Sequence, residues 1–518
     1  MNDEAAHIAD LSPGQRRLLE LMLRKRAQAH ADESIPALPR HSSESGQPAV
    51  FPLTASQRLL WFTEQRQPDL AAPPVTLTLR LHGPLDVGAL QASLSEICRR
   101  HEALRTTFQT REEDGEPVQI VGPPRPVSLS KLDLSEMPSP AREAEADRLL
   151  VQEVQRPFDL SKDLMLRATL LRLGDEEHML LLVMPHIVSD GWSLEVLFGE
   201  LQALYKASRS GRAAKLLELP IQYADYALWE RQRLQDGALQ QQMEYWKKQL
   251  ADAAKVLDVP TDHPKPLSTV EGIWQEKRMP ASLLEELHAL CRRHNVTLFV
   301  TLVSGWATLL HRYSGQDDIL ILTPFANRNH AEVVGLIGMF SNTFIVRHDL
   351  SGDPSFLELL GRVRQTVLDA IANGELPIEM VLKEVQPTPM TWFSLQEDPR
   401  YSLELDGLQV EWITDINRTR TSSFLSLWMY EGDEGLTAWL NYHPDLFEGP
   451  TIARMLGHLQ TLLESVVADP EQRISKLPVP IKAGGGRRAR FKRWLRRVAE
   501  RARGRLRHTV RRARRAAG

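Results

Sequence analysis

The sequence predicts a mixed α/β (α+β) fold made of two similar lobes. Short runs of apolar and β-branched residues alternate with amphipathic helical segments, which is typical of layered helix-and-sheet domains. This mixture occurs once before about residue 235 and again after it, and no linker-like break interrupts the chain from Phe51 to about Pro480. We therefore expect an N-terminal lobe over 51–235 and a C-terminal lobe over 236–480.

Individual elements follow from local patterns. The expected strands are the runs "VTLTLRLHG", "MLRATLLRLG", "HMLLLVM", "DILILTP" and "FIVRHDL". The expected helices are "VGALQASLSEICRRH", "SLLEELHALCRRH", "TLFVTLVSGWATLLHRY", "SFLELLGRVRQTVLDAI" and "TIARMLGHLQTLLESVV", in which apolar residues repeat at helical spacing.

Regions at both ends fall outside the two lobes. "LSPGQRRLLELMLRKRAQA" predicts a leading helix within 1–30, with Ser12 as its N-cap and Pro13 at its first position. Residues 31–50 are rich in Pro, Ser and charge and predict a linker. Residues 481–518 form a glycine-led basic tail.

The composition is that of an ordinary globular protein. The 518 residues are 42% hydrophobic and 25% charged, enough for a large core. Cys98 and Cys291 are far apart and form neither a CxxC pattern nor a disulfide framework. The N-terminus lacks the apolar core of a signal peptide, and no apolar run approaches 18 residues. We expect a cytoplasmic protein.

The stretch "MLLLVMPHIVSDGWS" places a histidine directly after a buried strand. Pro185 ends the strand because it cannot donate to a β-ladder, and Ser193 is the expected N-cap of the following helix. His186 and Asp190 therefore lie on a turn between strand and helix, where functional residues concentrate. From these residues alone, His186 is either a catalytic group or a polar group satisfied at a surface turn.

Six ordered stretches, covering about residues 51–480, resemble the conserved segments of condensation domains from nonribosomal peptide synthetases. "PHIVSDGWS" is similar to their HHxxxDG signature. "LTASQRLLWFTEQ" and "RRHEALRTTF" precede it, and "YADYALW", "TPFANRN" and "LIGMFSNTFIVR" follow it. The resemblance implies two chloramphenicol acetyltransferase-like lobes that form a pseudo-dimer with an active-site tunnel between them.

The same resemblance implies a condensing acyltransferase that joins a carrier-bound thioester to an acceptor amine, or to a hydroxyl. His186 matches the second signature histidine, which would accept a proton or hold the amine in line. An imidazole pKa of about 6.5 suits this work near neutral pH. Asp190 would pair with Arg328 and, together with Gly191, support the turn.

Three residues are candidates for positioning the substrate: Asn342, Ser189 and Trp192. The resemblance places Asn342 near the active site, and a strand-end hydrogen bond is an equal alternative. Four other motif residues are expected to tie core elements together and not to touch substrate: Arg105, Asp225, Tyr226 and Trp229.

Two features depart from the family pattern. Pro185 replaces the first signature histidine and so lacks both a side-chain donor and a backbone N–H. Residues 381–396 replace a longer family segment with an RDxSRNPL-like end, and Ile378 stands where the family has phenylalanine. These departures favour an alternative, an impaired condensation-like module that recruits carriers or tailoring enzymes. The retained residues, including His186 and Asp190, favour the enzyme.

The end of the sequence suggests how substrates arrive. No adenylation or carrier domain follows "DPEQRISKLPVP". We therefore expect a free-standing enzyme of peptide natural-product biosynthesis that meets peptidyl or acyl carrier proteins in trans. Its substrates would arrive on phosphopantetheine arms, and we expect no cofactor or metal bound by the chain itself.

The basic tail admits several partners. It contains 16 Lys and Arg residues against one acid, Glu500, which leaves a formal charge of −19 on residues 1–481. An acidic carrier or synthetase terminus, self-association, nucleic acid, an anionic membrane and the acidic body all remain open. Docking to a carrier or synthetase, or self-association, fits the trans requirement best. Nucleic acid is the least favoured.

Overall fold

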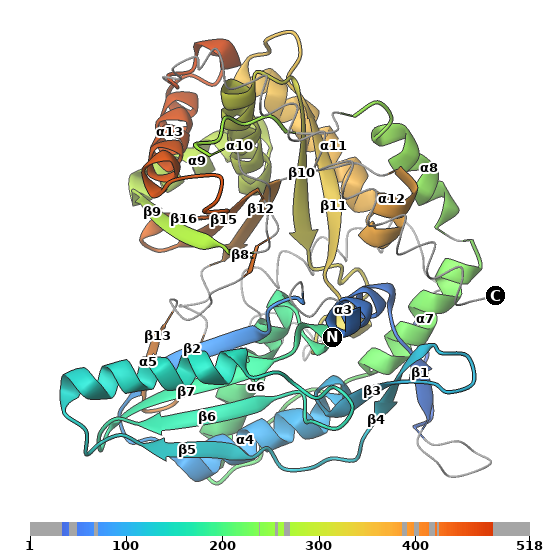
Figure 1. The fold of residues 1–518 in the computed structure, drawn as a ribbon, viewed down its shortest axis with the longest axis vertical. Coiled ribbons are helices and arrows are strands. Elements are labelled where there is room, and N and C mark those ends of the chain that lie inside the picture. Colours follow the sequence, from blue (N-terminus) through green and yellow to red (C-terminus); the bar gives the residue numbers. More distant parts are fainter. Residues whose placement is uncertain are drawn as a thin grey trace. The chain divides into compact units, whose positions relative to one another are not determined.

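A computed structural model of the chain (Figure 1) describes residues 34–40, 49–66, 71–237, 239–253, 257–263, 270–385, 391–397, 403–413, 420–421 and 424–479. The leading helix expected within 1–30 and the basic tail expected over 481–518 lie outside these ranges. Within them, no helix combines the length and apolarity that a membrane span requires.

The chain divides into two compact units. Unit 1 comprises residues up to Leu239 together with Ala326–Asn342 and Pro399–Asn417, and unit 2 comprises the rest. The contiguous lobes expected from the sequence therefore need one correction, because two later segments belong to unit 1. Backbone pairing explains the second of these segments, since β13 (Gln409–Trp412) pairs antiparallel with β2 (Val75–His82).

Unit 1 is built on a five-stranded sheet with the strand order β13-β2-β7-β6-β5. β7 (Glu177–Met184) lies at its centre, antiparallel to β2 and to β6 (Arg167–Arg172). β5 (Leu129–Asp133) pairs parallel with β6. The uniformly apolar sequence of β7 fits this central place, because both of its faces are buried.

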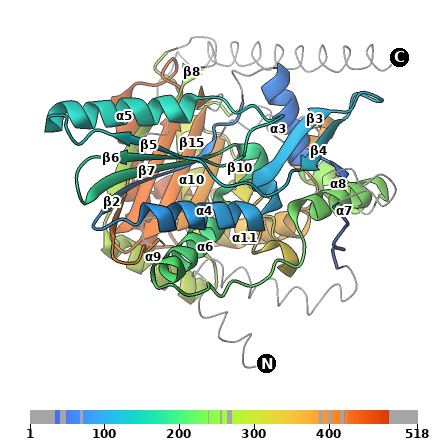
Figure 2. The same ribbon diagram turned by 90° about the horizontal axis from the view of Figure 1, so that it is seen from below.

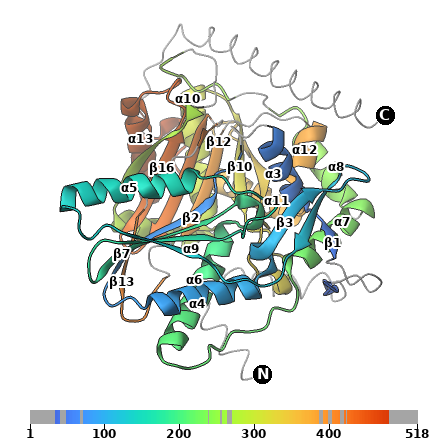
Figure 3. The same cartoon turned by 60° about the horizontal axis from the view of Figure 1, so that its bottom comes forward.

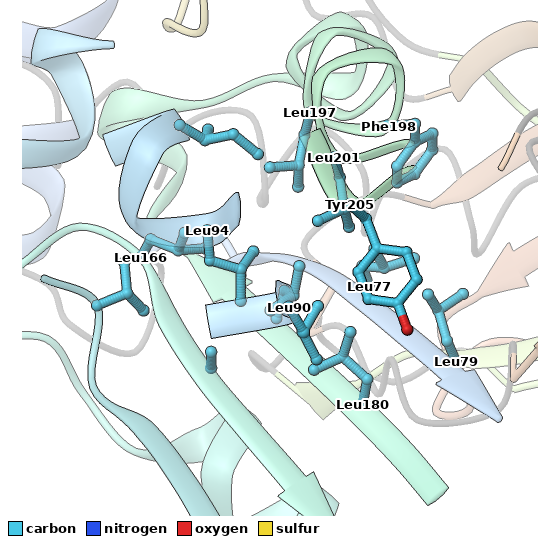
Figure 4. Packing of buried hydrophobic residues seen from close by; sticks show 14 of the residues in the cluster. Leu77, Leu79, Leu90, Leu94, Leu166, Leu180, Leu197, Phe198, Leu201 and Tyr205 are labelled. Carbon is cyan, nitrogen blue, oxygen red and sulfur yellow. The ribbon is translucent and has the colours of Figure 1, made fainter. Parts of the chain in front are cut away.

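Helices cover both faces of this sheet (Figure 2 and Figure 3). On one face lie α4 (Val87–Arg100) and α6 (Gly191–Arg209), and on the other lies α5 (Ser139–Gln155). Figure 4 shows how leucines from α4, α6 and the strands meet in one apolar cluster. Leu180 belongs to this cluster, whereas its neighbour Leu181 packs in the cluster on the α5 side. Alternation along the strand thus anchors β7 from both sides.

A smaller sheet with the order β1-β4-β3 completes unit 1. Its strands and the helices of the same unit have these bounds: β1 (Val50–Pro52), α3 (Ala55–Arg66), η2 (Glu102–Arg105), β3 (Thr106–Thr110), β4 (Pro117–Val121) and α7 (Tyr223–Gln235). Their buried side chains form a cluster that also contains Ile187 and Val188, the residues directly after His186.

Part of the expected linker packs against unit 1. Within residues 34–40, Arg40 lies 2.8 Å from Asp225 and 2.6 Å from Glu102, and the backbone N–H of Leu38 donates to Asp225. Ion pairs therefore hold this part of the segment predicted as a linker over 31–50 against unit 1.

Unit 2 is built on a six-stranded sheet with the order β11-β10-β12-β15-β16-β9. Its strands are β9 (Ile273–Met279), β10 (Asp318–Phe325), β11 (Asn342–Asp349), β12 (Thr391–Glu397), β15 (Leu425–Gly432) and β16 (Gly435–Tyr442), and a separate pair joins β8 (Val270–Glu271) to β14 (Arg420–Thr421). β10, β12 and β15 run parallel, whereas β15, β16 and β9 pair antiparallel. The helices are α8 (Gln240–Gln249), α9 (Ala281–His294), α10 (Leu298–Ser314), α11 (Phe356–Ala372), α12 (Ile378–Val385) and α13 (Gly449–Ala468).

Candidate active site

The turn after β7 is braced by the carbonyl of its proline. Pro185 has φ −66° and ψ 143°, which its ring permits, and it precedes the short helix η3 (His186–Val188). The Pro185 carbonyl accepts hydrogen bonds from the Val188 backbone N–H at 3.1 Å and from Ser189 Oγ at 3.0 Å. The residue therefore supports the turn without any side-chain donor.

His186 is half-buried at the start of η3. Its neighbours Ile187 and Val188 are almost fully buried, and Gln57 of α3 donates to the Ile187 carbonyl at 3.0 Å. The Nδ1 atom of His186 is buried and has no hydrogen-bond partner among the described residues. The contacts of Ile187 thus fix the backbone that carries the ring. Because Nδ1 is buried, Nε2 is the ring nitrogen left for an incoming group.

Asp190, not Ser193, is the N-cap of α6. The Asp190 carboxylate accepts from the Ser193 backbone N–H at 2.8 Å, and Ser193 Oγ in turn accepts from the Asp190 backbone N–H at 3.2 Å. The predicted cap was wrong because a reciprocal capping box places Ser193 at the third helical position. Gly191 is the first helical residue, and a Cβ added there would meet nothing within 4 Å. The position therefore has room for a side chain, and the support that the turn receives here comes from the capping box.

The structure brings Asp190 and Arg328 together. Arg328 Nη2 lies 3.2 Å from Asp190 Oδ1, and both side chains are fully buried. Asp190 Oδ2 also accepts from the backbone N–H groups of Phe340 and Ser341, both at 3.1 Å. Burial lowers the pKa of Arg328, and the neighbouring Asp190 opposes this shift.

A guanidinium remains charged in proteins, so Arg328 supplies the charge that a buried Asp190 needs. Arg328 Nη1 donates to the carbonyls of Val333 and Leu336, at 2.6 and 2.7 Å. Together with the N–H groups of Ser193, Phe340 and Ser341, Arg328 supplies hydrogen-bond donors to both carboxylate oxygens of Asp190. Its geometry fits structural support and not proton exchange.

The condensation-domain family model matches residues 47–483, most of the chain. The chain belongs to the condensation-domain family. Condensation domains are acyltransferases that form amide bonds, and the sequence resemblance to them is confirmed.

Curated relatives of this condensation domain are peptide synthetases. It is 42% identical to one component of the linear gramicidin synthase of Brevibacillus parabrevis over 439 residues, 83% of this chain and 9% of that protein. It is 38% identical to the phosphinothricin tripeptide synthetase PhsC of Streptomyces viridochromogenes over 488 residues, 92% of this chain and 44% of that protein. The chain therefore spans less than half the length of either relative.

Solved structures agree with the two-lobed α/β fold. A complex of the X-domain and OxyB from teicoplanin biosynthesis matches 88% of this chain and 100% of the matched chain, with a TM-score of 0.74 and 28% identity. The first condensation domain of the calcium-dependent antibiotic synthetase matches 84% and 100%, with a TM-score of 0.70 and 22% identity. At that identity, the second likeness shows the fold alone.

Three residues of the condensation domain's motifs hold the 326–342 segment in unit 1. Trp192 Nε1 donates to the Val334 carbonyl at 2.9 Å, and His101 Nδ1 accepts from the Ile337 backbone N–H at 3.2 Å. Tyr223 donates to the Met339 carbonyl at 2.7 Å. Burial raises the pKa of Tyr223 well above its usual range, so its hydroxyl stays protonated as a donor.

Sequence reasoning missed His101 and Tyr223 as supports of the site, and also missed Gln57. The available signal was their position within three of the quoted motif stretches, "RRHEALRTTF", "YADYALW" and "LTASQRLLWFTEQ". What the sequence lacked was the pairing partner, because each of the three bonds a backbone group more than 100 residues away.

Two of the three residues expected to position substrate are used elsewhere. Ser189 is fully buried and its hydroxyl donates to the Pro185 carbonyl, so it supports the turn. The indole N–H of Trp192 is bonded to Val334. Asn342 begins β11 and is 6% exposed.

The four motif residues expected to tie core elements together have such contacts. Arg105 donates to the Gly122 carbonyl, and Asp225 is held by Arg40. The ring centroids of Tyr226 and Phe340 lie 4.8 Å apart, and those of Trp229 and His330 lie 4.7 Å apart.

A cavity of about 750 Å³ opens in unit 1 beside α3. Its lining includes Trp61 and Glu64 of α3, Phe108 of β3 and residues 157–163, but no residue of the His186 turn. Burial raises the pKa of Glu64.

Within the described part of the chain, no group of three or more His, Cys, Asp or Glu residues could hold a metal ion.

Proposed function

We propose that this condensation domain joins a carrier-bound acyl or aminoacyl thioester to the amine, or the hydroxyl, of an acceptor, with His186 as the catalytic residue. The observation that carries the proposal is the placement of His186. The residue is half-buried at the start of a turn. Hydrogen bonds to the Pro185 carbonyl and from Gln57 fix the backbone of this turn.

The chemistry requires a neutral nucleophile in a fixed position. An ammonium group has no lone pair, so the acceptor must first lose one proton to solvent. As the neutral nitrogen then attacks the thioester carbon, His186 Nε2 accepts a second proton from it. The new C–N bond forms, the C–S bond breaks, and the proton passes to the leaving thiolate, which returns as the carrier's thiol. Positioning of the two reactants contributes alongside proton transfer.

Asp190 and Arg328 support this arrangement without exchanging protons. Their buried pair joins the start of α6 to the 326–342 segment. Gly191 is the first residue of the same helix. We assign Asn342 a contact with substrate at the end of its strand and no chemical step.

Peptidyl or acyl carrier proteins are the proposed partners, and their phosphopantetheine arms carry both substrates. The chain itself would bind no cofactor. Docking through the basic tail stays a prediction, because residues 481–518 lie outside the described part of the chain. Action in the cytoplasm is likewise an expectation from the sequence.

A second candidate function is recruitment of carriers or of a tailoring enzyme by an impaired module. Two observations favour it. Pro185 replaces the first signature histidine, and the chain is 28% identical to an X-domain that was solved in complex with OxyB. The retained His186 with its fixed turn favours the enzyme.

One experiment separates the two candidates. An acyl group is loaded on one carrier and an amino acid on another, the full chain is added, and product is followed by mass spectrometry. If the chain is the enzyme, condensed product forms, and the His186→Ala variant forms it about 10²–10⁴-fold more slowly. Recruitment yields carrier or tailoring-enzyme binding with no product above the no-enzyme control, across several carrier pairs.

A further inference from the structure

The six-stranded sheet of unit 2 has two faces of different character. Helices α9, α10 and α13 pack on one face (Figure 1), where Phe393, Leu427 and Leu440 are fully buried. Strand alternation and register place five aromatic residues on the opposite face, and each of them is half-buried: Trp274, Trp392, Trp428, Tyr430 and Trp439. Large aromatic side chains that gather on one face and stay partly exposed are typical of a binding surface.

The strand register sets two polar residues among these rings. Ser426 of β15 pairs directly with Asn441 of β16. On the outer sides of this pair, Trp392 of β12 pairs with Ser426, and Trp274 of β9 pairs with Asn441. Directly paired residues hold their Cβ atoms about 5 Å apart. The four side chains therefore form one continuous row, with the polar pair between two indoles.

Two more tryptophans form the next row on the same face. Trp428 and Trp439 pair with each other and lie two residues along from Ser426 and Asn441. The ring centroid of Trp274 lies 6.4 Å from that of Trp428 and 6.5 Å from that of Trp439, and both contacts are edge-to-face. We call these residues the indole site: Ser426, Asn441, Trp274, Trp392, Trp428 and Trp439.

Asn441 is the observation that points to a ligand. Its side chain is 3% exposed, and its Nδ2 has no hydrogen-bond partner among the described residues. A buried amide donor normally has an acceptor, because desolvation without one is unfavourable. Asn441 shares the face of the four tryptophans, so the missing acceptor would come from a molecule held against these rings.

We propose that the indole site binds a neutral aromatic ring that bears a hydrogen-bonding oxygen, as the side chain or acyl group of one carrier-bound substrate. Indole rings stack well against another aromatic ring. The Asn441 amide would donate a hydrogen bond to the oxygen on the ligand's ring. The Ser426 hydroxyl would accept a hydrogen bond from the hydroxyl group that contains this oxygen. None of the six residues is charged. Glu276, which pairs with Trp439 on the same face, is already neutralised by Arg278 at 2.7 Å, so the site favours a neutral ligand. The inference deepens the proposed function and rests on it for the identity of the ligand as a substrate.

The test measures binding without turnover. Calorimetry compares two N-acetylcysteamine thioesters, 4-hydroxyphenylacetyl and 4-methylphenylacetyl, on the full chain. These probes differ only by a hydroxyl in place of a methyl group. We expect the wild type to bind the phenol about tenfold more tightly, near 1.4 kcal/mol. Asn441→Leu, of similar size, should abolish that preference and leave the affinity for the methyl probe unchanged.

The aromatic residues need their own variants. Trp439→Ala should weaken both probes at least tenfold, and Trp439→Phe should retain most of the affinity, with thermal unfolding of each variant recorded to verify folding. Ile273→Ala is the matched control, because Ile273 precedes Trp274 on β9 but lies on the opposite face and is 46% exposed. It should bind both probes as the wild type does.

Equal affinity of the wild type for the two probes, or wild-type affinity in Trp439→Ala, overturns the inference. Its failure is distinguishable from failure of the proposed function. If condensed product forms while the indole-site variants bind normally, the function stands and the indole site does not. If binding follows the predictions and no product forms, the site stands and the catalytic function does not.

Discussion

Arg328 Nη2 lies 3.2 Å from Asp190 Oδ1, and neither side chain is exposed. This contact crosses 138 positions of sequence and joins the helix that follows the His186 turn to a segment from the second half of the chain. The pair makes the site and the fold of unit 1 depend on the same interaction.

We expect Arg328→Met to lower the free energy of unfolding by about 3 kcal/mol, because it leaves the Asp190 carboxylate buried without its counter-charge. Urea unfolding measures the change. The loss of unfolding free energy in the Asp190→Asn, Arg328→Met double variant should be smaller than the sum of the losses in the two single variants. Additive losses would contradict the pairing.

An exposed pair of unit 1 provides the control. Arg99 and Glu96 lie 2.7 Å apart on α4, and their side chains are 57% and 36% exposed. Water screens such a pair, so Arg99→Met should change the free energy of unfolding by less than about 1 kcal/mol.

Arg40 should contribute to stability although it precedes the first strand. Its guanidinium forms two hydrogen bonds of 2.8 Å to Asp225, whose side chain is fully buried. Arg40→Ala should lower the free energy of unfolding by about 2 kcal/mol. The buried Asp225 carboxylate would lose its counter-charge and keep hydrogen bonds from the backbone N–H groups of Leu38 and Gln222. Arg148→Ala, on the exposed face of α5, should leave the unfolding midpoint unchanged. Equal midpoints for both variants would show that residues 34–40 do not support unit 1.

The sequence predicted most of the elements because their patterns are local. The expected strand "HMLLLVM" became β7, and "TLFVTLVSGWATLLHRY" became α10. The errors arose where a long-range partner decides the outcome. Ser193 was taken as the N-cap because capping residues are interchangeable by type, whereas the donors from Phe340 and Ser341 select Asp190 for the buried position.

Residues 31–50 illustrate the same limit. Their Pro, Ser and charge are typical of a linker, but the meaning of Arg40 depends on Asp225, which is 185 positions away. The candidate site was recognised through its resemblance to a family. Residue patterns alone left His186 between a surface turn and a catalytic role, because neither the half-burial of a ring nor the support from Gln57 is encoded locally.

Stability should fall in mild acid partly through His348 of β11. Burial lowers the pKa of His348 to about 4, from 6.5. Below pH 6.5 the unfolded chain binds a proton at this position that the folded chain does not, so stability is complete above pH 6.5 and decreases as the pH falls toward 4. The slope contributed is up to about 1.4 kcal/mol per pH unit, for a total of about 3 kcal/mol.

The variant His348→Leu isolates this contribution. It should unfold in urea with a smaller dependence on pH between 6.5 and 4 than the wild type, whatever its stability at pH 7. Parallel curves for the two proteins over this range would mean that His348 is protonated in the folded state.

The last prediction concerns the two adjacent residues of the turn. If His186 accepts the proton of the acceptor, His186→Ala should reduce turnover by about 10²–10⁴-fold, the usual effect of positioned proton transfer. The unfolding midpoint should hardly change, because Ile187 and Val188 anchor the turn. Added imidazole should restore part of the activity, which a purely structural role would not allow.

Pro185→His should have a much smaller effect in either direction. The backbone carbonyl at position 185 braces the turn, and any residue at that position supplies it. Product is measured with matched carrier pairs by mass spectrometry, and equal product from wild type, His186→Ala and the no-enzyme control would falsify the catalytic role.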